Sequence, residues 1–161
     1  MQQTESQSEA ANSVLLLGNP NVGKTTLFNR LCGLRSATSN FPGSTVEARI
    51  GTSSSETIKR TFTDLPGLYS LYANDDLSKV CRNALDRIEH NSPDAVLVVI
   101  DATNLRRNLT IVNEILHQGV PCVIALSMVD IAQKSGLTID TKKFGEHLGC
   151  QVVAVHPRTG A

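Results

Sequence analysis

Closely spaced cysteines are missing from this sequence. The four cysteines lie far apart and form no C-x-x-C pair; they are Cys32, Cys81, Cys122 and Cys150. A structural zinc site needs ligands at short spacing, so that class of site is excluded. The spacing favours reduced, mostly buried thiols of a cytosolic protein.

Long apolar runs, a secretory leader and an excess of charge are missing as well. No run reaches the roughly 18–20 apolar residues that a membrane-spanning helix needs, so we expect the chain itself to be soluble. Residues 1–12 are polar, and we interpret them as a disordered lead-in and not as a signal peptide. The 15 Lys and Arg residues balance 15 Asp and Glu residues; without a basic block, nucleic acid is not expected as a partner.

The sequence does contain apolar strand patterns that alternate with helical patterns. Its 161 residues, 40% of them apolar, suffice for one packed domain. Strands are predicted at 13–17, 46–52, 57–63, 95–101, 122–126 and 151–155. Helices are predicted at 24–33, 77–90, 105–116 and 141–148, and a loop at 34–44. This order predicts a doubly wound α/β fold, with a six-stranded, mostly parallel sheet and helices on both faces.

One segment fits the phosphate-binding pattern G-x-x-x-x-G-K-[ST], between a predicted strand and a predicted helix. Its residues are Gly18, Asn19, Pro20, Asn21, Val22, Gly23, Lys24 and Thr25, with Thr26 directly after it. The glycines let backbone N–H groups turn inward around a phosphate, and the helix N-terminus adds partial positive charge. Lys24 can then reach the β and γ phosphates, and the Thr25 hydroxyl can bind Mg²⁺. The alternative is a glycine-rich turn without a ligand.

Two later segments extend this predicted triphosphate site. The pattern D-x-x-G is formed by Asp64, Leu65, Pro66 and Gly67, and the loop before the second strand holds Gly43, Ser44 and Thr45. Asp64 is predicted to hold Mg²⁺ through water, and Gly67 to offer its N–H to the γ-phosphate. Thr45 is predicted to close on Mg²⁺ when the γ-phosphate is present. Without the phosphate loop, these segments would be a Pro-Gly turn and a solvent-facing threonine.

Selection of guanine is predicted after the strand at 122–126. Where guanine-specific proteins carry N-K-x-D, this chain has Ser127, Met128, Val129 and Asp130. The Asp130 carboxylate can accept both the N1–H and the exocyclic amine of guanine, a pair that adenine does not offer; the alternative is a helix N-cap. Ser127 is shorter than Asn and lacks the amide that links the base to the phosphate loop. The Met128 thioether can still pack on the base, as a Lys stem does.

The base site is completed after the last predicted strand, by His156, Pro157 and Arg158. Many GTPases have Ser-Ala-Lys here, and the Ala N–H donates to guanine O6. If the register holds, Pro157 takes that place and has no N–H to give. Each lost hydrogen bond costs about 0.5–1.5 kcal/mol, so we predict weaker guanine nucleotide binding than in proteins with both elements. Sub-micromolar binding of GDP would contradict this.

Four segments are longer and more specific than the phosphate loop. Residues 40–47 are NFPGSTVE, residues 64–71 are DLPGLYSL, residues 101–108 are DATNLRRN and residues 125–130 are ALSMVD. They resemble the patterns N-[WF]-[PA]-G-x-T-V-E, D-x-P-G-x-Y-S-L, D-A-T-N-L-x-R-N and A-L-N-M-x-D, with Ser in place of the Asn of the last pattern. These are patterns of the cytosolic G domain of the bacterial ferrous-iron transporter B (FeoB) family, and the resemblance covers about residues 13–160.

The resemblance implies a Ras-like P-loop G domain over residues 13–161, as a fragment of a longer membrane protein. It implies GTP and GDP as ligands, and downstream helical and transmembrane domains at the cytoplasmic face of the inner membrane. The activity implied is hydrolysis of GTP to regulate iron uptake, and a homo-oligomer is compatible with it. A Ras-like domain usually has one more helix after its sixth strand, which we expect this chain to lack.

The resemblance also implies a slow, potassium-stimulated mechanism. Leu68 stands where Ras-like proteins position the attacking water with Gln. Members of the family hold K⁺ with a phosphate-loop asparagine, which corresponds to Asn21, although Asn21 could also only brace the loop. Asn21, Lys24, Thr45 and Gly67 are the expected catalytic residues.

Two other functions remain open from the sequence. One is a ribosome-assembly GTPase of the Era or Der type, which shares the phosphate loop and the potassium site. The other is a nucleotide sensor with negligible turnover, suggested by Leu68 and the altered base site. No iron site is predicted, since the four histidines form no cluster in the sequence.

Overall fold

The computed structural model describes residues 12–53, 59–86 and 94–157. Its elements, in chain order, are β1 (Ser13–Gly18), α1 (Lys24–Cys32), β2 (Ser36–Asn40), β3 (Glu47–Thr52), β4 (Thr61–Asp64), α2 (Asp76–Asp86), β5 (Ala95–Asp101), η2 (Ala102–Asn104), α3 (Leu105–His117), β6 (Cys122–Ser127), α4 (Val129–Lys134), α5 (Thr141–Leu148) and β7 (Gln151–Ala154). The lead-in predicted at 1–12 falls outside this range except for Asn12, and so does Arg158.

The strands form one seven-stranded sheet in the order β2-β3-β4-β1-β5-β6-β7. Strands β4, β1, β5, β6 and β7 run parallel, while β2 and β3 are antiparallel to their neighbours. The register pairs Gly18 with Val99, Leu16 with Asp64, and Asp101 with Ser127. The carboxyl ends of the central strands therefore lie at one edge, where open α/β sheets bind their ligands.

The predicted α/β class is confirmed, but the predicted number of strands was wrong. The loop expected at 34–44 contains β2, which pairs with β3 along its whole length. Four of the five β2 residues are exposed, so the strand shows none of the apolar alternation from which a strand can be predicted. Strand β4 begins at Thr61, within the stretch predicted as 57–63, and α4 was not predicted at all.

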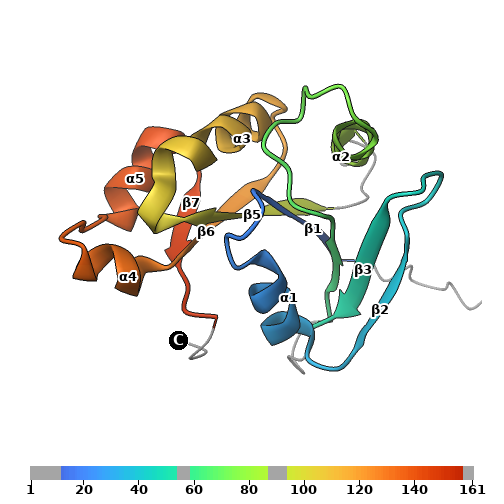
Figure 1. The fold of residues 1–161 in the computed structure, drawn as a ribbon, viewed down its shortest axis with the longest axis horizontal. Helices are drawn as coiled ribbons and strands as arrows, with labels where there is room; N and C mark the ends of the chain where they lie inside the picture. Colours follow the sequence, from blue (N-terminus) through green and yellow to red (C-terminus); the bar gives the residue numbers. More distant parts are fainter. Residues whose placement is uncertain (1–11, 54–58, 87–93, 158–161) are drawn as a thin grey trace, which may run out of the picture.

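Helices cover both faces of the sheet, but unevenly (Figure 1). The larger core joins alternate residues of the central strands, such as Leu15 and Leu17, to α2, α3, α4 and α5. On the opposite face, Leu16 packs against Phe28 of α1 in a smaller cluster. Helix α1 thus packs on this face beside β1, and the loop that joins the carboxyl end of β1 to α1 lies at the ligand-binding edge. None of the helices described is both long and apolar enough to cross a membrane.

Candidate nucleotide site

The phosphate loop turns from β1 into α1 through two residues with left-handed backbone. Asn21 has φ 63° and Gly23 has φ 89°, a region that Gly and Asn enter most readily. A Cβ at Gly18 would lie 2.5 Å from the carbonyl oxygen of Val99, so the start of the loop requires glycine. Among the residues described, no side chain caps the N-terminus of α1, whose amides point out of the helix end. The loop and this helix end together form a site suited to a phosphate.

Lys24 and Asp64 form a buried ion pair at this edge of the sheet. Their side chains are 7% and 5% exposed. The Lys24 ammonium group donates to Asp64 Oδ1 and to the carbonyl oxygen of Leu65. A buried charge is costly unless it is paired and hydrogen-bonded, and each of these groups supplies the other with a partner. The structure thus brings together the predicted phosphate-binding lysine and the predicted Mg²⁺ carboxylate.

The D-x-x-G segment lies directly against the phosphate loop. A Cβ at Gly67 would lie 2.6 Å from Cα and N of Pro20, so glycine is required by this close approach. The Leu68 N–H donates to the Gly18 carbonyl oxygen at 3.0 Å. The Leu68 side chain is buried in the larger core, which means that it cannot orient a water molecule.

The residues at this edge include oxygen donors that fit the expected cations. The exposed Thr25 hydroxyl and the Asp64 carboxylate are the hard oxygen ligands that Mg²⁺ prefers. For K⁺, Asn21 offers an exposed amide, and Asn19 has a buried side-chain oxygen without a hydrogen-bond partner among the residues described. Thr45 lies elsewhere. With Gly43 and Ser44 it lines an open hollow of about 620 Å³ against Asp76 and Lys79 of α2.

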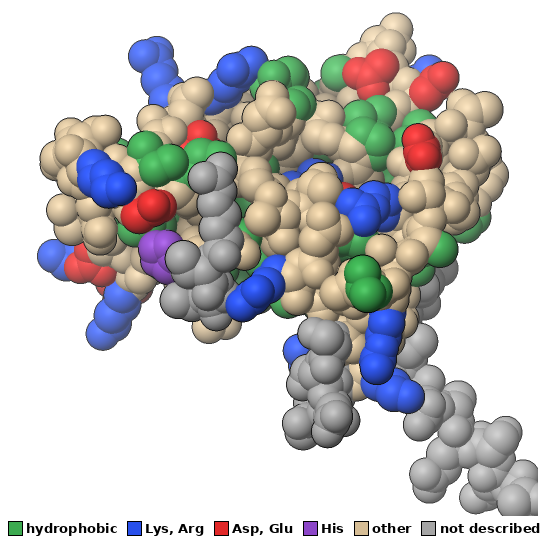
Figure 2. Space-filling view, turned by 60° about the horizontal axis from the view of Figure 1, so that its bottom comes forward, with side chains coloured by type: hydrophobic (Ala, Val, Ile, Leu, Met, Phe, Trp, Pro, Cys, Tyr) green, Lys and Arg blue, Asp and Glu red, His purple; other side chains and the backbone are tan. Residues whose placement is uncertain are grey.

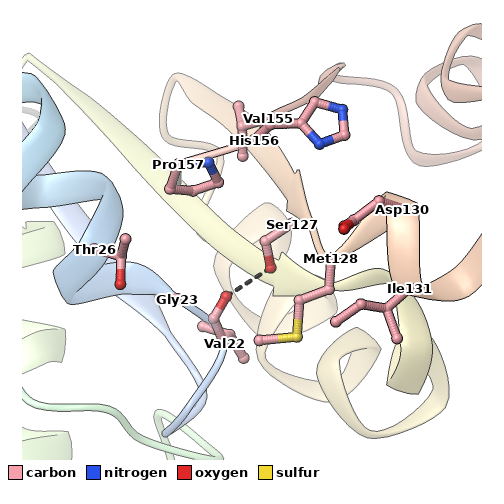
Figure 3. Close-up of a pocket in the computed structure, with 10 residues that line it drawn as sticks. All are labelled: Val22, Gly23, Thr26, Ser127, Met128, Asp130, Ile131, Val155, His156 and Pro157. Atoms are coloured by element: carbon pink, nitrogen blue, oxygen red, sulfur yellow. Dashed lines mark hydrogen bonds between the residues drawn. The ribbon is translucent and has the colours of Figure 1, made fainter. Parts of the chain in front are cut away.

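A second cavity, of about 120 Å³, lies between the phosphate loop and the ends of β6 and β7. Its lining residues, drawn in Figure 3, are Val22, Gly23, Thr26, Ser127, Met128, Asp130, Ile131, Val155, His156 and Pro157. All the predicted base-site residues within the described range therefore line one cavity. Sequence analysis missed Ile131 and Val155, although each adjoins a predicted site residue.

Within this cavity, the Ser127 hydroxyl contacts the phosphate loop directly. It lies 2.6 Å from the carbonyl oxygen of Val22 and 2.9 Å from that of Ile100, and can donate to either. Asp130 is not the N-cap of α4, because Met128, with φ 57°, occupies that position. Figure 3 shows the Asp130 carboxylate turned toward Ser127, on the side of the cavity.

The D-A-T-N segment, residues 101–104, forms the turn from β5 into α3 at this edge of the sheet. Asp101 Oδ1 accepts from the N–H and the hydroxyl of Thr103, at 2.7 and 2.6 Å. The buried Asn108 amide donates to the Asn104 carbonyl oxygen at 2.7 Å. These bonds fix the turn from β5 into α3.

On the face shown in Figure 2, Lys and Arg side chains are scattered and do not gather in one patch.

The chain matches the family model described as ferrous iron transport protein B over residues 12–161. It is 38% identical over 148 residues to an Fe(2+) transporter FeoB of Leptospira biflexa, covering 92% of this chain and 21% of that protein. It is 42% identical over 139 residues to the FeoB of Salmonella typhimurium, covering 86% of this chain and 18% of that protein. The chain thus spans about a fifth of the length of these relatives.

Solved structures of the same family have the same fold. The G domain of the T. maritima FeoB iron transporter superposes with a TM-score of 0.81 at 36% identity, over 92% of this chain and 89% of that one. An S. thermophilus NFeoB mutant bound to GDP gives 0.84 at 37% identity, over 93% of this chain and 57% of that one. By sequence and by fold, the chain belongs to the ferrous iron transport protein B (FeoB) family, as an N-terminal G domain.

Proposed function

We propose that this chain binds GTP, hydrolyses it to GDP and phosphate, and thereby regulates iron uptake through a membrane domain of the same protein. The observation that carries the proposal is that the phosphate loop, the D-x-x-G segment and the base cavity meet at one edge of the sheet. Membership in the FeoB family argues against a ribosome-assembly GTPase of the Era or Der type.

The phosphates are bound by the loop from Gly18 to Thr25 and the amides of α1. Lys24 supplies a cation to the β and γ phosphates, and Gly67 offers its N–H to the γ-phosphate. Asp130 selects guanine by accepting from N1–H and the exocyclic amine. Ser127 keeps the base cavity attached to the phosphate loop through the Val22 carbonyl group.

Two cations complete the proposal. Thr25 and Asp64 would hold Mg²⁺, joined by Thr45 after it leaves the hollow beside α2. Asn21 would hold K⁺. When bound, these ions supply positive charge that offsets the charge developing between the β and γ phosphates. Because Leu68 is buried, the attacking water has to be oriented by other groups, such as backbone in the loop at 40–45.

The wider role is supported by the relatives, which are described as Fe(2+) transporters and are about five times as long as this chain. The G domain would lie at the cytoplasmic face of the inner membrane, followed by helical and transmembrane domains. Exchange between the GTP and GDP states would move the loop at 43–45 and the D-x-x-G segment, and so act on those domains. Assembly as a homo-oligomer is compatible with this arrangement.

Hydrolysis of GTP by the purified chain, measured with Mg²⁺ in KCl and in NaCl, tests the proposal. We expect turnover in KCl, and at least about tenfold less for Lys24→Ala, because a phosphate-binding charge is lost. Lys143→Ala, which removes an exposed lysine of α5, should leave the rate unchanged. Asn21→Ala should abolish the difference between the two salts.

Three results would contradict parts of this proposal. Equal rates in both salts would reject the potassium site while leaving the GTPase intact. Retention of GTP without measurable turnover would favour a nucleotide sensor. Failure to retain any guanine nucleotide would reject the site as a whole.

A further inference from the structure

Glu114 of α3 belongs to none of the nucleotide-binding motifs, yet it holds the segment that follows Gly67. Its Oε1 accepts from the Ser70 hydroxyl at 2.8 Å, and its Oε2 accepts from the Leu71 backbone N–H at 2.6 Å. The side chain is half-buried, which shields both bonds from water. Hydrogen bonds to a charged group are stronger than neutral ones, so two of them fix this backbone firmly.

Two contacts flank Glu114 on the same side of α3. Arg107 lies over the Tyr69 ring, with 4.4 Å between the guanidinium carbon and the ring centroid. The Gln118 amide donates to the Tyr72 hydroxyl at 2.8 Å. Arg107 and Glu114 lie seven residues apart on α3, and Gln118, four residues after Glu114, directly follows its last residue, so the three lie along one side of the helix. Each residue of the segment from Tyr69 to Tyr72 thus contacts one of these three side chains.

The opposite side of this segment is held by α2. The Ser78 hydroxyl donates to the Ser70 carbonyl oxygen at 2.9 Å, and the Arg82 guanidinium donates to the Leu71 carbonyl oxygen. Ser70 and Leu71 are therefore held by four hydrogen bonds from two helices, and Glu114 accepts two of them.

Helix α3 also contacts the phosphate loop. The Asn19 amide donates to the Arg107 carbonyl oxygen at 3.3 Å, and Gly67 lies against Pro20. Four residues of extended chain span at most about 14 Å, so fixing Leu71 restricts where Gly67 can lie. Helix α3 thus holds two segments beside the position expected for the γ-phosphate. Arg107 contacts the phosphate loop, and Glu114 holds the segment after Gly67.

We propose that Glu114 is a positioning residue for GTP hydrolysis, which sets the Gly67 amide opposite the γ-phosphate by holding Ser70 and Leu71. The proposal rests on the proposed GTPase function. GDP has no γ-phosphate, so binding of GDP does not depend on this contact. Hydrolysis does depend on it, because a displaced amide stabilises the developing charge less.

The test compares Glu114→Ala with Glu114→Gln in the 161-residue chain. Kinetics of GTP hydrolysis, GDP affinity and Tm are measured for each. Glu114→Ala should lower kcat about tenfold, with KM for GTP and Kd for GDP changed less than about twofold. Glutamine can accept from the Leu71 N–H and donate to the Ser70 hydroxyl, so it should restore kcat to within about threefold. Glu146→Ala, at an exposed glutamate of α5, serves as the matched control.

An unchanged kcat in Glu114→Ala would overturn the positioning role. So would a loss of GDP affinity in parallel with kcat, since that would indicate general damage to the fold. Ser70→Ala gives a second measurement, because its effect on kcat should largely disappear in the Glu114→Ala background. If the unaltered chain itself shows no turnover, the proposed GTPase function fails, which is distinct from failure of the Glu114 role.

Discussion

Ser127 and Asp130 divide the tasks of the base cavity between two side chains. A serine hydroxyl has one hydrogen to donate, and here it faces the carbonyl oxygens of Val22 and Ile100. No donor of Ser127 is left for a base. In the proposed function, recognition of the purine therefore depends on the Asp130 carboxylate, which is exposed and lies in the first turn of α4.

Asp130→Asn should exchange the base that the chain prefers. An amide can donate to the 2-oxo group of xanthine, but it cannot accept two N–H groups of guanine as a carboxylate does. We expect Kd for GDP to rise at least about tenfold, and xanthosine diphosphate to bind more tightly than to the unaltered chain. Titration with both nucleotides measures this. Asp140→Asn is the control, because asparagine caps a helix as well as aspartate does.

The residues of the phosphate loop and the base cavity could be predicted because their signals are short and local. The contact between Ser127 and Val22 could not, because it joins positions 105 residues apart and depends on how the loop is folded. The position of Thr45 beside α2 also escaped prediction, since no local pattern determines where a loop residue lies.

Among the elements, α5 and β2 mark the two extremes of what local sequence determines. Helix α5 has the predicted bounds, with the Asp140 side chain capping the Lys143 N–H at its start and Gly149, φ 72°, at its end. Strand β5 was likewise predicted with its observed bounds, because a continuous apolar run is distinctive. Strand β2 has no such signal and owes its form to pairing with β3.

Gly145→Ala should destabilise the chain although alanine favours helix. The gain in helix propensity is about 1 kcal/mol. The new Cβ, however, would lie 2.7 Å from the Cys150 carbonyl oxygen, a backbone atom directly before β7. We expect a net loss of about 1–2 kcal/mol in the free energy of unfolding, measured with urea. Lys142→Ala on the same helix should stay within about 0.5 kcal/mol, and a more stable Gly145→Ala would show that α5 can move away.

On the scale of the whole molecule, the packed core determines how the cysteines behave. Burial raises the pKa of Cys81 from its ordinary value of 9.0 to about 12, and burial also raises that of Cys122 to about 12. The pKa values of Cys32 and Cys150 are raised as well, mainly by burial. Few thiolates therefore exist at neutral pH, and these thiols are expected to react slowly.

Alkylation with iodoacetamide at pH 8 should therefore be slow in the folded chain and fast in urea, as followed by mass spectrometry. A raised pKa in the folded state also fixes the sign of a pH effect. The protonated thiols contribute their full stability below pH 9, and this contribution is lost as pH rises toward about 12. Rapid labelling of Cys81 or Cys122 without denaturant would contradict this account of the core.

The ion pair between Lys24 and Asp64 has a consequence for how an anion enters this edge of the sheet. The ammonium group already has a negative neighbour, so in the proposed function an incoming phosphate would replace the Asp64 carboxylate as its partner. Asp64 would then be available to a metal ion that arrives with the same nucleotide. On this proposal, nucleotide binding exchanges one ion pair for two new ones, and neither buried charge is left without a partner.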